Sequence, residues 1–278
     1  MSRLFEAAVI AASYAKFRPQ PPATVIAHVI KYVKEGLLTE HPIDLSLAVD
    51  IGCGSGQCTN FLAPHFTTVH GFDTSANQIK HAKENNSFAN VLYDVADGHS
   101  LPVMDNSVDL VTCCQSFHWL DTNIFYPELN RILKRNGVVA LITYEMPFVV
   151  LNATHKTGEQ DMTRQLIRSF YGHSKIKSYW AAKERCLVDT AYKTVVLPFP
   201  NQMRIDDTLI SEGVSASSIV GYINSWSAFQ SLKDKNAKEA DEFIDEFKKV
   251  STDMCGGDLD ADCFSLEYPF HLVMARKK

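Results

Sequence analysis

The sequence lacks the features that mark secreted, membrane-spanning and zinc-binding proteins. Its seven cysteines are odd in number and irregularly spaced, and none forms a CxxC pair, whereas secreted domains usually carry paired cysteine frameworks. No run approaches the roughly 18 uncharged apolar residues that a membrane helix needs. The first ten residues contain Arg3 and Glu6 and lack an apolar stretch long enough for a signal peptide, so none is expected. We therefore expect reduced thiols, no bound metal, no membrane partner and a cytoplasmic location.

The chain also lacks an excess of basic residues. It has 27 Lys and Arg against 32 Asp and Glu, a formal net charge of −5, and its basic residues are scattered. Nucleic-acid binding depends on a basic patch that neutralises phosphates, so we expect a small-molecule partner and no nucleic acid, in a monomer or homodimer. A hydrophobic content of 46% over 278 residues is enough for one large core, which predicts a single catalytic domain over residues 1–278.

Short β-rich runs alternate with helical stretches between residues 45 and 145. This alternation is typical of βαβ units that build a parallel sheet with helices on its faces, an α/β fold. Apolar residues at helical spacing predict helices that begin near Gln57, Ala76 and Thr122. The strands are expected at residues 46–51, 68–72, 90–95, 108–114 and 138–143.

The alternation stops after residue 145. Residues 146–189 have helical character and aromatic side chains, and we interpret them as a helical cap inserted over the sheet. We expect strands at 193–200 and 264–275 and helices at 217–232 and 237–250, so that the core comprises residues 45–145 and 190–278. The acidic, lysine-rich segment 233–249 is expected to be the solvated face of a helix.

A glycine-rich turn follows the first predicted strand. The strand runs through Asp50 directly into the turn, where glycines allow a sharp bend and let a ligand approach the backbone closely. The spacing differs from the dinucleotide fingerprint GxGxxG, because the third glycine comes one residue early. We predict a cofactor without pyrophosphate; a plain strand-to-helix turn is the alternative. The residues assigned to this site are Asp50, Gly52, Cys53, Gly54 and Gly56.

Acidic residues also end the next two predicted strands. Asp73, about 20 residues after the glycine turn and followed by Thr74, is placed to accept both hydroxyls of a ribose; its alternative role is to cap the following helix. Asp97 and Gly98 follow the third strand, where Asp97 is expected beside an adenine amino group, with an ordinary turn as the alternative.

Three candidate residues follow the fourth predicted strand, at the edge where open α/β sheets bind ligands. Gln115 is assigned to the cofactor site. His118 is the catalytic candidate, because an imidazole there can orient a nucleophile or accept a proton, and Trp119 is assigned to the substrate side. A structural histidine and a packing tryptophan are the alternatives.

In this order and spacing, residues 45–145 resemble the class I S-adenosylmethionine-dependent methyltransferases. Four further runs, residues 14–19 (YAKFRP), 117–119 (FHW), 179–180 (YW) and 222–229 (YINSWSAF), resemble the trans-aconitate methyltransferase-like group. The resemblance implies S-adenosyl-L-methionine as cofactor, with Asp50 and the glycines beside its methionine part, Asp73 at the ribose and Asp97 near the adenine. It also implies a Rossmann-like, seven-stranded sheet of order 3-2-1-4-5-7-6, whose last strand is antiparallel between its neighbours.

Residues outside the sheet are expected to complete the site. In a lid formed by residues 1–40, Tyr14 would hydrogen-bond the methionine carboxylate and Arg18 would add positive charge; a helix simply packed on the sheet is the alternative. On the substrate side, aromatic rings can surround a sulfonium and an arginine can pair with a carboxylate. The residues assigned there are Trp180, Arg185 and Trp226, each of which also fits an ordinary core position.

The expected reaction is methyl transfer to a small molecule, O-methylation of an organic acid being the preferred form. In-line transfer requires alignment of the nucleophile, methyl group and sulfur with water excluded, and an ionised carboxylate needs no base. A macromolecular methyltransferase is disfavoured by the net charge and by Gln-Ser-Phe-His at 115–118 in place of an Asn-Pro-Pro-aromatic motif. A non-catalytic cofactor-binding protein and a nicotinamide-dependent oxidoreductase remain as alternatives.

Overall fold

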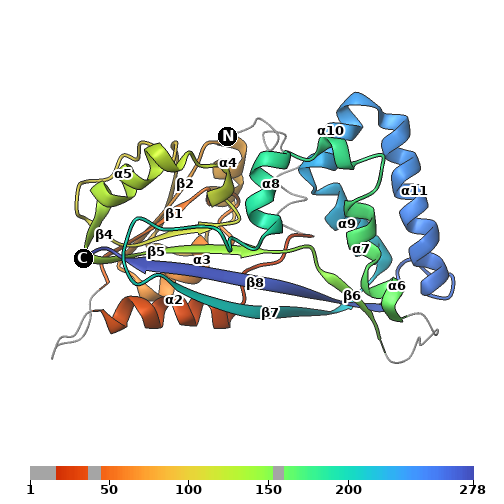
Figure 1. Cartoon of the computed structure of the whole chain (residues 1–278), viewed down its shortest axis with the longest axis horizontal. Helices are drawn as coiled ribbons and strands as arrows, with labels where there is room; N and C mark the ends of the chain where they lie inside the picture. Colours follow the sequence, from red (N-terminus) through yellow and green to blue (C-terminus); the bar gives the residue numbers. More distant parts are fainter. Residues whose placement is uncertain (1–16, 37–44, 153–159) are drawn as a thin grey trace.

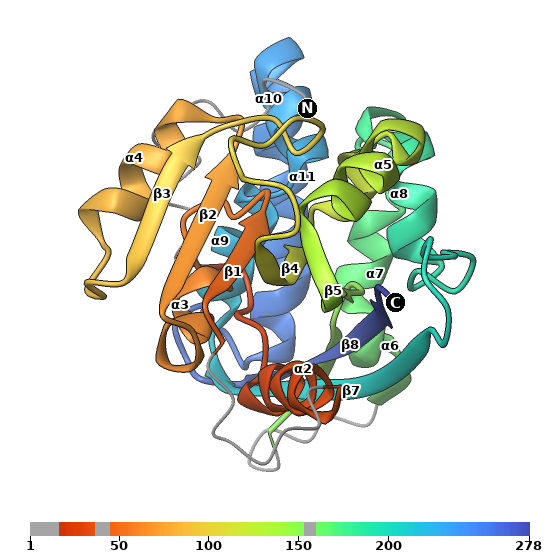
Figure 2. The ribbon, with the colours of Figure 1, turned by 90° about the vertical axis from the view of Figure 1, so that its left-hand side faces the viewer.

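The computed structural model describes residues 17–36, 45–152 and 160–278. Five parallel strands form the main sheet in the spatial order β3-β2-β1-β4-β5 (Figure 2). The carboxyl ends of the strands meet at one edge, as the alternation of strands and helices predicted. The strands are β1 (Leu47–Ile51), β2 (Thr68–Asp73), β3 (Val91–Val95), β4 (Val108–Cys114) and β5 (Leu133–Tyr144).

An antiparallel strand, β8 (Phe264–Arg276), extends the sheet beyond β5. β5 pairs with residues 270–276 of β8 and β6 (Phe148–Leu151) pairs with residues 264–267, so β6 prolongs β5 along one edge of β8. β7 (Met203–Val214) pairs along residues 264–274 and takes the other edge. The predicted order 3-2-1-4-5-7-6 is confirmed, with the last strand antiparallel and the short β6 as an extra strand.

The prediction of a strand at residues 193–200 was wrong. These residues form turns and bends, and the strand that pairs with β8 begins at Met203. Val195 and Leu197 are buried while Val196 is exposed, which imitates the alternation of a strand, but Pro198 and Pro200 lack the N–H groups that a sheet ladder needs. The helix predicted at 217–232 is two helices, α9 (Ala216–Asn224) and α10 (Ser227–Lys235).

Helices cover both faces of the parallel strands. Ala48 and Leu110 belong to the apolar core on one face, and Val49 and Val111 to the core on the other, as the alternation of strand side chains requires. The first core contains buried residues of α2 (Ala23–Glu35), α3 (Thr59–Leu62), η2 (Ala63–His65) and α4 (Ala76–Glu84), and the second contains those of α5 (Thr122–Ile132). The fold is a three-layer, Rossmann-like α/β sandwich.

The remaining helices gather at one end of the sheet (Figure 1). The prediction placed α9, α10 and α11 (Ala237–Met254) in the core segment 190–278; instead they lie beside the helices of the cap. Phe170 of α7 packs on Phe243 and Phe247 of α11, with ring centroids 5.4 and 5.0 Å apart, so the apolar stripe of α11 is buried on the cap. The other cap elements are α6 (Gln160–Arg164), α7 (Leu166–Tyr171), η5 (Lys177–Tyr179) and α8 (Ala182–Asp189).

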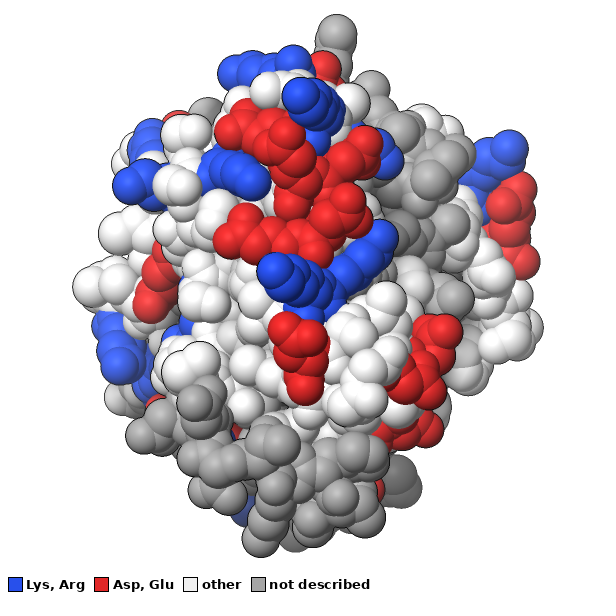
Figure 3. Space-filling model, turned by 90° about the vertical axis from the view of Figure 1, so that its right-hand side faces the viewer, with Lys and Arg blue, Asp and Glu red and all other residues white. Residues whose placement is uncertain are grey.

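Most charged side chains of the segment 233–249 lie on the outer face of α11; Lys233, Asp234 and Lys235 belong to the end of α10. Figure 3 shows acidic groups interspersed with basic ones on this end of the molecule, and Asp241, Glu242, Asp245 and Glu246 are exposed. The prediction of a solvated helix face is confirmed. Among the described residues, no helix has the length and apolar character needed to cross a membrane, and all seven cysteines are free thiols.

Candidate cofactor-binding site

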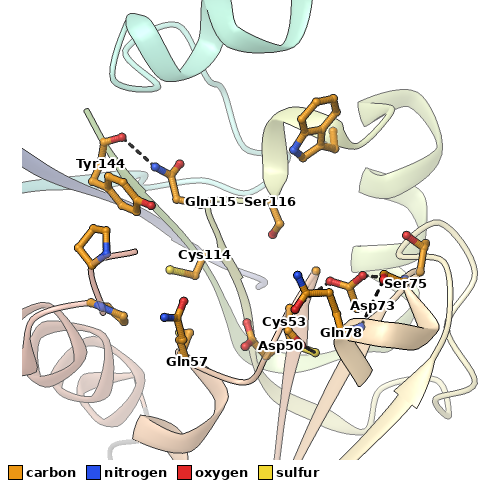
Figure 4. Close-up of a pocket in the computed structure, with 17 residues that line it drawn as sticks. Asp50, Cys53, Gln57, Asp73, Ser75, Gln78, Cys114, Gln115, Ser116 and Tyr144 are labelled. Carbon is orange, nitrogen blue, oxygen red and sulfur yellow. Dashed lines mark hydrogen bonds between the residues drawn. The ribbon is translucent and has the colours of Figure 1, made fainter. Parts of the chain in front are cut away.

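A hollow opens at the carboxyl ends of β1, β2, β4 and β5 (Figure 4). Its free space is about 880 Å³ when the open mouth is included. Eight residues that the sequence assigned to the site line this hollow: Asp50, Gly52, Cys53, Gly54, Asp73, Thr74, Gln115 and Trp119.

The glycine turn forms the floor of the hollow and admits only glycine at two positions. Gly52 has φ +65° and Gly56 has φ +87°, a region that other residues adopt at a cost. A Cβ on Gly52 would lie 2.4 Å from the Cβ of Ser116, and one on Gly56 would lie 2.2 Å from the Tyr93 hydroxyl. Gly56 does not itself line the hollow, so its role is to shape the turn.

Asp50 is fully buried beneath the turn. Its two carboxylate oxygens accept hydrogen bonds from the hydroxyls of Thr59 and Thr112, both at 2.7 Å. Burial raises the pKa of Asp50 to about 6. The carboxylate therefore ties the start of α3 to β4 and is mostly ionised at neutral pH, which favours a cationic group in the hollow.

Asp73 ends β2 and is held by two backbone groups. Its Oδ2 accepts from the N–H of Gly54 at 2.9 Å and its Oδ1 from the N–H of Ser75 at 2.8 Å, while burial raises its pKa. A carboxylate has about four acceptor positions, so Asp73 can also accept hydrogen bonds from ribose hydroxyls. The cap of α4 is Ser75, whose hydroxyl accepts from the N–H of Gln78.

Gln78 lines the hollow and was missed in the sequence. Its side chain is 3% exposed, and its Oε1 has no hydrogen-bond partner within the described part of the chain. A buried acceptor without a partner costs about 1–3 kcal/mol, which argues that a ligand hydrogen bonds to it. Its position in the first turn of α4, just after Asp73, is the signal that could have identified it.

Gln115 occupies a strained position at the end of β4. It has φ +52°, a conformation that a residue other than glycine rarely adopts. Its Nε2 donates to the carbonyl of Tyr144 at 2.8 Å, and its Oε1 accepts from the hydroxyl of Thr143 at 2.8 Å. The side chain is thus fixed to β5, beside Tyr144, which also lines the hollow and was likewise missed.

Comparison with known proteins agrees with this geometry. Residues 49–141, from β1 through most of β5, match the family model described as a methyltransferase domain. This region is a class I S-adenosylmethionine-dependent methyltransferase domain. The methyltransferase has S-adenosylmethionine as its cofactor, and the glycine turn and Asp73 offer the backbone and carboxylate contacts that this cofactor requires.

Relatives of the methyltransferase cover most of the chain at low identity. A Dictyostelium discoideum protein classed as a methyltransferase is 28% identical over 233 residues, 84% of this chain and 82% of that protein. A Saccharomyces cerevisiae protein classed as an S-adenosylmethionine-dependent methyltransferase is 24% identical over 86% of this chain and 87% of its own.

Of two further similarities, one covers only a third of the chain and the other concerns the fold alone. A malonyl-[acyl-carrier protein] O-methyltransferase of Hahella chejuensis is 33% identical over 92 residues, 32% of this chain and 33% of that protein. The structure of an Anaeromyxobacter dehalogenans protein classed as a type II methyltransferase superposes with a TM-score of 0.66 at 22% identity, over 94% of this chain and 98% of that one. The superposition supports the fold alone.

His118, the catalytic candidate of the methyltransferase, lies behind the wall of the hollow in η3 (Phe117–Trp119). Its Nδ1 is 3.0 Å from the hydroxyl of Tyr192. Burial, together with the positive charge of Arg185, lowers the pKa of His118 to about 3. A neutral imidazole with so low a pKa accepts a proton poorly at neutral pH.

Asp97 and Gly98 lie outside the lining of the hollow. Asp97 accepts hydrogen bonds from the backbone N–H of His99 at 3.0 Å and contacts its Nδ1 at 2.7 Å. A Cβ on Gly98 would lie 2.6 Å from Ile51. These contacts shape the loop after β3, and the adenine contact assigned to Asp97 stays a prediction.

Arg18 connects the mouth of the hollow to the cap. Its Nε and Nη2 donate to the hydroxyl and carbonyl of Ser225 at 2.9 and 3.0 Å, and its Nη1 donates to the Tyr144 hydroxyl at 3.4 Å. Pro19 and Pro21, which follow it, line the hollow. Tyr14 lies outside the described residues.

The three substrate residues predicted in the second half of the chain do not line the hollow as the described residues define it. Arg185 is bound to the Tyr171 hydroxyl at 3.1 Å and to Asp189 at 2.9 Å. Trp226 is fully buried and packs on Trp180 with ring centroids 5.6 Å apart. In this structure all three stabilise contacts between cap helices.

Proposed function

We propose that this methyltransferase transfers a methyl group from S-adenosyl-L-methionine to a small organic acid, on oxygen. The observation that carries the cofactor part is the pairing of the glycine turn with Asp73, whose carboxylate is oriented by the N–H of Gly54. In this proposal Asp73 and Gln78 bind the ribose, and Asp50 lies beside the methionine part. The acceptor enters near Gln115, Trp119 and Tyr144.

The acceptor class is argued from charge and from one similarity. Arg18 is a cation 3.4 Å from the hydroxyl of Tyr144, which lines the hollow, so an acid bound beside Tyr144 would have a positive charge near it. The O-methyltransferase of Hahella chejuensis, similar over a third of the chain, supports methylation on oxygen. The resemblance to the trans-aconitate methyltransferase-like group points to the same substrate class.

The proposed mechanism needs no general base. A carboxylate acceptor is ionised at neutral pH, so the protein has to align it with the methyl group and exclude water. The low pKa of His118 suits this mechanism, because the residue stays neutral. The fixed side chain of Gln115 and the ring of Trp119 supply rigid walls for the alignment.

Calorimetric titration with S-adenosylmethionine and S-adenosylhomocysteine tests the cofactor part. We expect micromolar binding to the wild-type protein and its loss in Asp73→Ala. Asp94→Ala is the matched control, because Asp94 is an exposed β3 carboxylate paired with His70 and Lys83 and should leave the affinity unchanged. No binding to the wild-type protein would refute the proposed site.

A screen of small carboxylic acids for methyl ester formation tests the acceptor part. With the best acid, Arg18→Gln should raise KM at least about tenfold, and Arg18→Lys should restore part of the loss because the charge remains. Turnover of amines or of protein and RNA substrates, with no ester formed from any acid, would replace the acid proposal by another acceptor class.

A further inference from the structure

A tyrosine hydroxyl and an arginine lie together at one side of the cofactor hollow. Tyr144 ends β5, is 5% exposed and lines the hollow, and the Nη1 of Arg18 lies 3.4 Å from its hydroxyl oxygen. In Figure 4, Tyr144 and Asp73 lie on opposite sides of the hollow. A carboxylate is therefore placed at one side of the hollow and a guanidinium near the other.

We propose that the hydroxyl of Tyr144 donates a hydrogen bond to the carboxylate of the methyl acceptor, and that this contact, with the charge of Arg18 beside it, selects an acid over an amine. The inference rests on the proposed function, which places the acceptor acid beside Tyr144. It adds the group that binds this acid and the way the cap positions that group: Tyr144 contacts the acceptor, and Ser225 of the cap is a positioning residue.

The hydroxyl of Tyr144 has a proton to offer to a ligand. A phenol can donate one hydrogen bond and also accept. A guanidinium can only donate, so the hydroxyl oxygen accepts in its contact with Arg18. That contact is the one hydrogen bond of this hydroxyl within the described part of the chain. Its proton can therefore bind an anionic oxygen that enters the hollow.

Packing fixes the ring of Tyr144, and with it the position of the hydroxyl. The ring centroid lies 5.9 Å from that of Tyr268, edge to face, and 5.2 Å from that of Phe270. The backbone carbonyl of Tyr144 accepts from the Nε2 of Gln115 at 2.8 Å. A donor that is already fixed before the ligand arrives loses little conformational entropy on binding, which favours recognition by this group.

Ser225 of the cap holds the guanidinium that accompanies the hydroxyl. It is fully buried and follows α9, and its hydroxyl and carbonyl oxygens accept from the Nε and Nη2 of Arg18 at 2.9 and 3.0 Å. The same hydroxyl donates to the carbonyl of Tyr222 at 2.6 Å, and the guanidinium lies 5.2 Å from the centre of the Tyr222 ring. The cap thus directs Nη1 of Arg18 at Tyr144 without itself lining the hollow.

The charges near Tyr144 favour an anion over a protonated amine. An ammonium group bound there would be repelled by Arg18, whereas a carboxylate gains a charge-assisted hydrogen bond and an opposite charge. Glu145, the next residue, does not line the hollow; its carboxylate is paired with His271 at 3.1 Å and with Arg168 at 3.2 Å. One oxygen of a bound carboxylate can contact Tyr144 and leave the other available for methylation.

Calorimetric titration of small acids into the protein saturated with S-adenosylhomocysteine tests this contact without turnover. The probes are acetate, malonate, succinate and benzoate, each paired with its amide. We expect at least one acid to bind the wild-type complex, and its amide to bind at least about tenfold more weakly. Tyr144→Phe should weaken binding of that acid about ten- to hundredfold, the usual loss for a hydrogen bond to a charged group, and change the affinity for S-adenosylhomocysteine by less than about twofold.

The matched control is Tyr126→Phe. The hydroxyl of Tyr126 donates to the carbonyl of Val196 at 2.9 Å, and Tyr126 does not line the hollow, so both affinities should stay as in the wild type.

The positioning role of Ser225 has its own test. Ser225→Ala should weaken acid binding about three- to tenfold in the wild-type background and have no further effect in Arg18→Gln, because it acts through Arg18. An equal loss in both backgrounds would overturn the positioning role, since it would mean that Ser225 only supports the fold.

The contact with Tyr144 and the proposed function fail in different ways. Equal affinity of the acid for the wild type and Tyr144→Phe would overturn the contact alone. So would a loss of affinity for S-adenosylhomocysteine as large as that for the acid, which would assign the hydroxyl to the methionine part of the cofactor. If no acid binds the wild-type complex, or S-adenosylhomocysteine itself does not bind, the proposed function is wrong and the inference falls with it.

Discussion

At the scale of single residues, the carboxylate of Asp50 lines the hollow at a cost in the free energy of folding. Its carboxylate is fully buried and forms no ion pair with any of the described residues; two threonine hydroxyls are its side-chain partners. The rise of its pKa from 3.8 to about 6 corresponds to about 3 kcal/mol of unfavourable free energy when it is ionised. A cationic cofactor beside it would offset part of this cost.

The first prediction concerns Asp50→Asn. The pKa of Asp50 is higher in the folded state than in the unfolded state, so its protonated form stabilises the fold. This contribution to the free energy of unfolding is complete below pH 3.8 and is lost as the pH rises to about 6. The variant cannot ionise there, so without cofactor its free energy of unfolding should exceed that of the wild type at pH 7, by up to about 3 kcal/mol. Urea unfolding at pH 4 and pH 7 checks this, and an equal pH dependence in both proteins would contradict it.

The second prediction concerns His118→Gln. Because burial keeps the pKa of His118 near 3, the imidazole is neutral throughout pH 6–8, and Gln can still accept the hydrogen bond of Tyr192. We expect the pH–rate profile to keep its shape and kcat to fall less than about tenfold, whereas loss of a general base usually costs about 10²–10⁴. Steady-state kinetics from pH 6 to 8 is the measurement; a loss in that range with a flattened profile would restore the base role.

At the scale of elements, a histidine side chain connects β8 with β7 and with the residue that follows β5. His271 of β8 contacts Glu145, just beyond β5, at 3.1 Å and Asp206 of β7 at 2.8 Å. Hydrogen bonds with His271 and, to a smaller extent, Arg168 lower the pKa of Glu145. Partial burial by itself would raise the pKa of Asp206, but hydrogen bonds with His271 and Arg204 lower it. This cluster fixes the register of β7 and β8 beside the site.

The third prediction follows for His271→Leu. Carboxylates whose pKa is lower in the folded state stabilise the protein at pH values above their unfolded-state pKa, which is near 4. This stabilisation is lost as the pH falls further. The variant should be about 1–3 kcal/mol less stable at pH 7, with a smaller additional loss toward pH 3. Thermal melts across this range measure both effects.

The control for that prediction is His70→Leu. His70 pairs with Asp94, whose side chain is 55% exposed, and an exposed pair contributes about 0–1 kcal/mol. Equal effects of the two substitutions would show that the buried position of His271 is not what matters.

At the scale of the whole molecule, β8 links the core and the cap. Its 13 residues pair with β5 and β7 of the main sheet and, at the other end, with β6 beside α6 and α7. Figure 1 shows it running the length of the sheet. One strand shared by both parts couples their unfolding.

The fourth prediction is therefore a single cooperative thermal transition. We expect the calorimetric and van't Hoff enthalpies to agree, and S-adenosylhomocysteine to move the whole transition to higher temperature, because it binds only the folded state. Two resolved transitions, with only one shifted by the ligand, would contradict the coupling.

The sequence by itself determined the sheet and the cofactor turn. Short apolar strands, the glycines at 52, 54 and 56 and the acid at 73 are local signals: a parallel sheet places the ends of β1, β2 and β4 together, so residues distant in the chain meet predictably. Asp50, Gly52, Asp73, Gln115 and Trp119 line the hollow for this reason.

Only the tertiary structure showed that the predicted cap residues do not line the hollow, and how the cap is built. Aromatic composition could not distinguish a substrate wall from helix packing, and Trp226 proved fully buried. The apolar stripe of α11 could pack on the face of a sheet or on another helix; in the structure it packs on Phe170 of α7. The buried acceptor of Gln78 likewise depends on long-range packing, which leaves no local pattern in the chain.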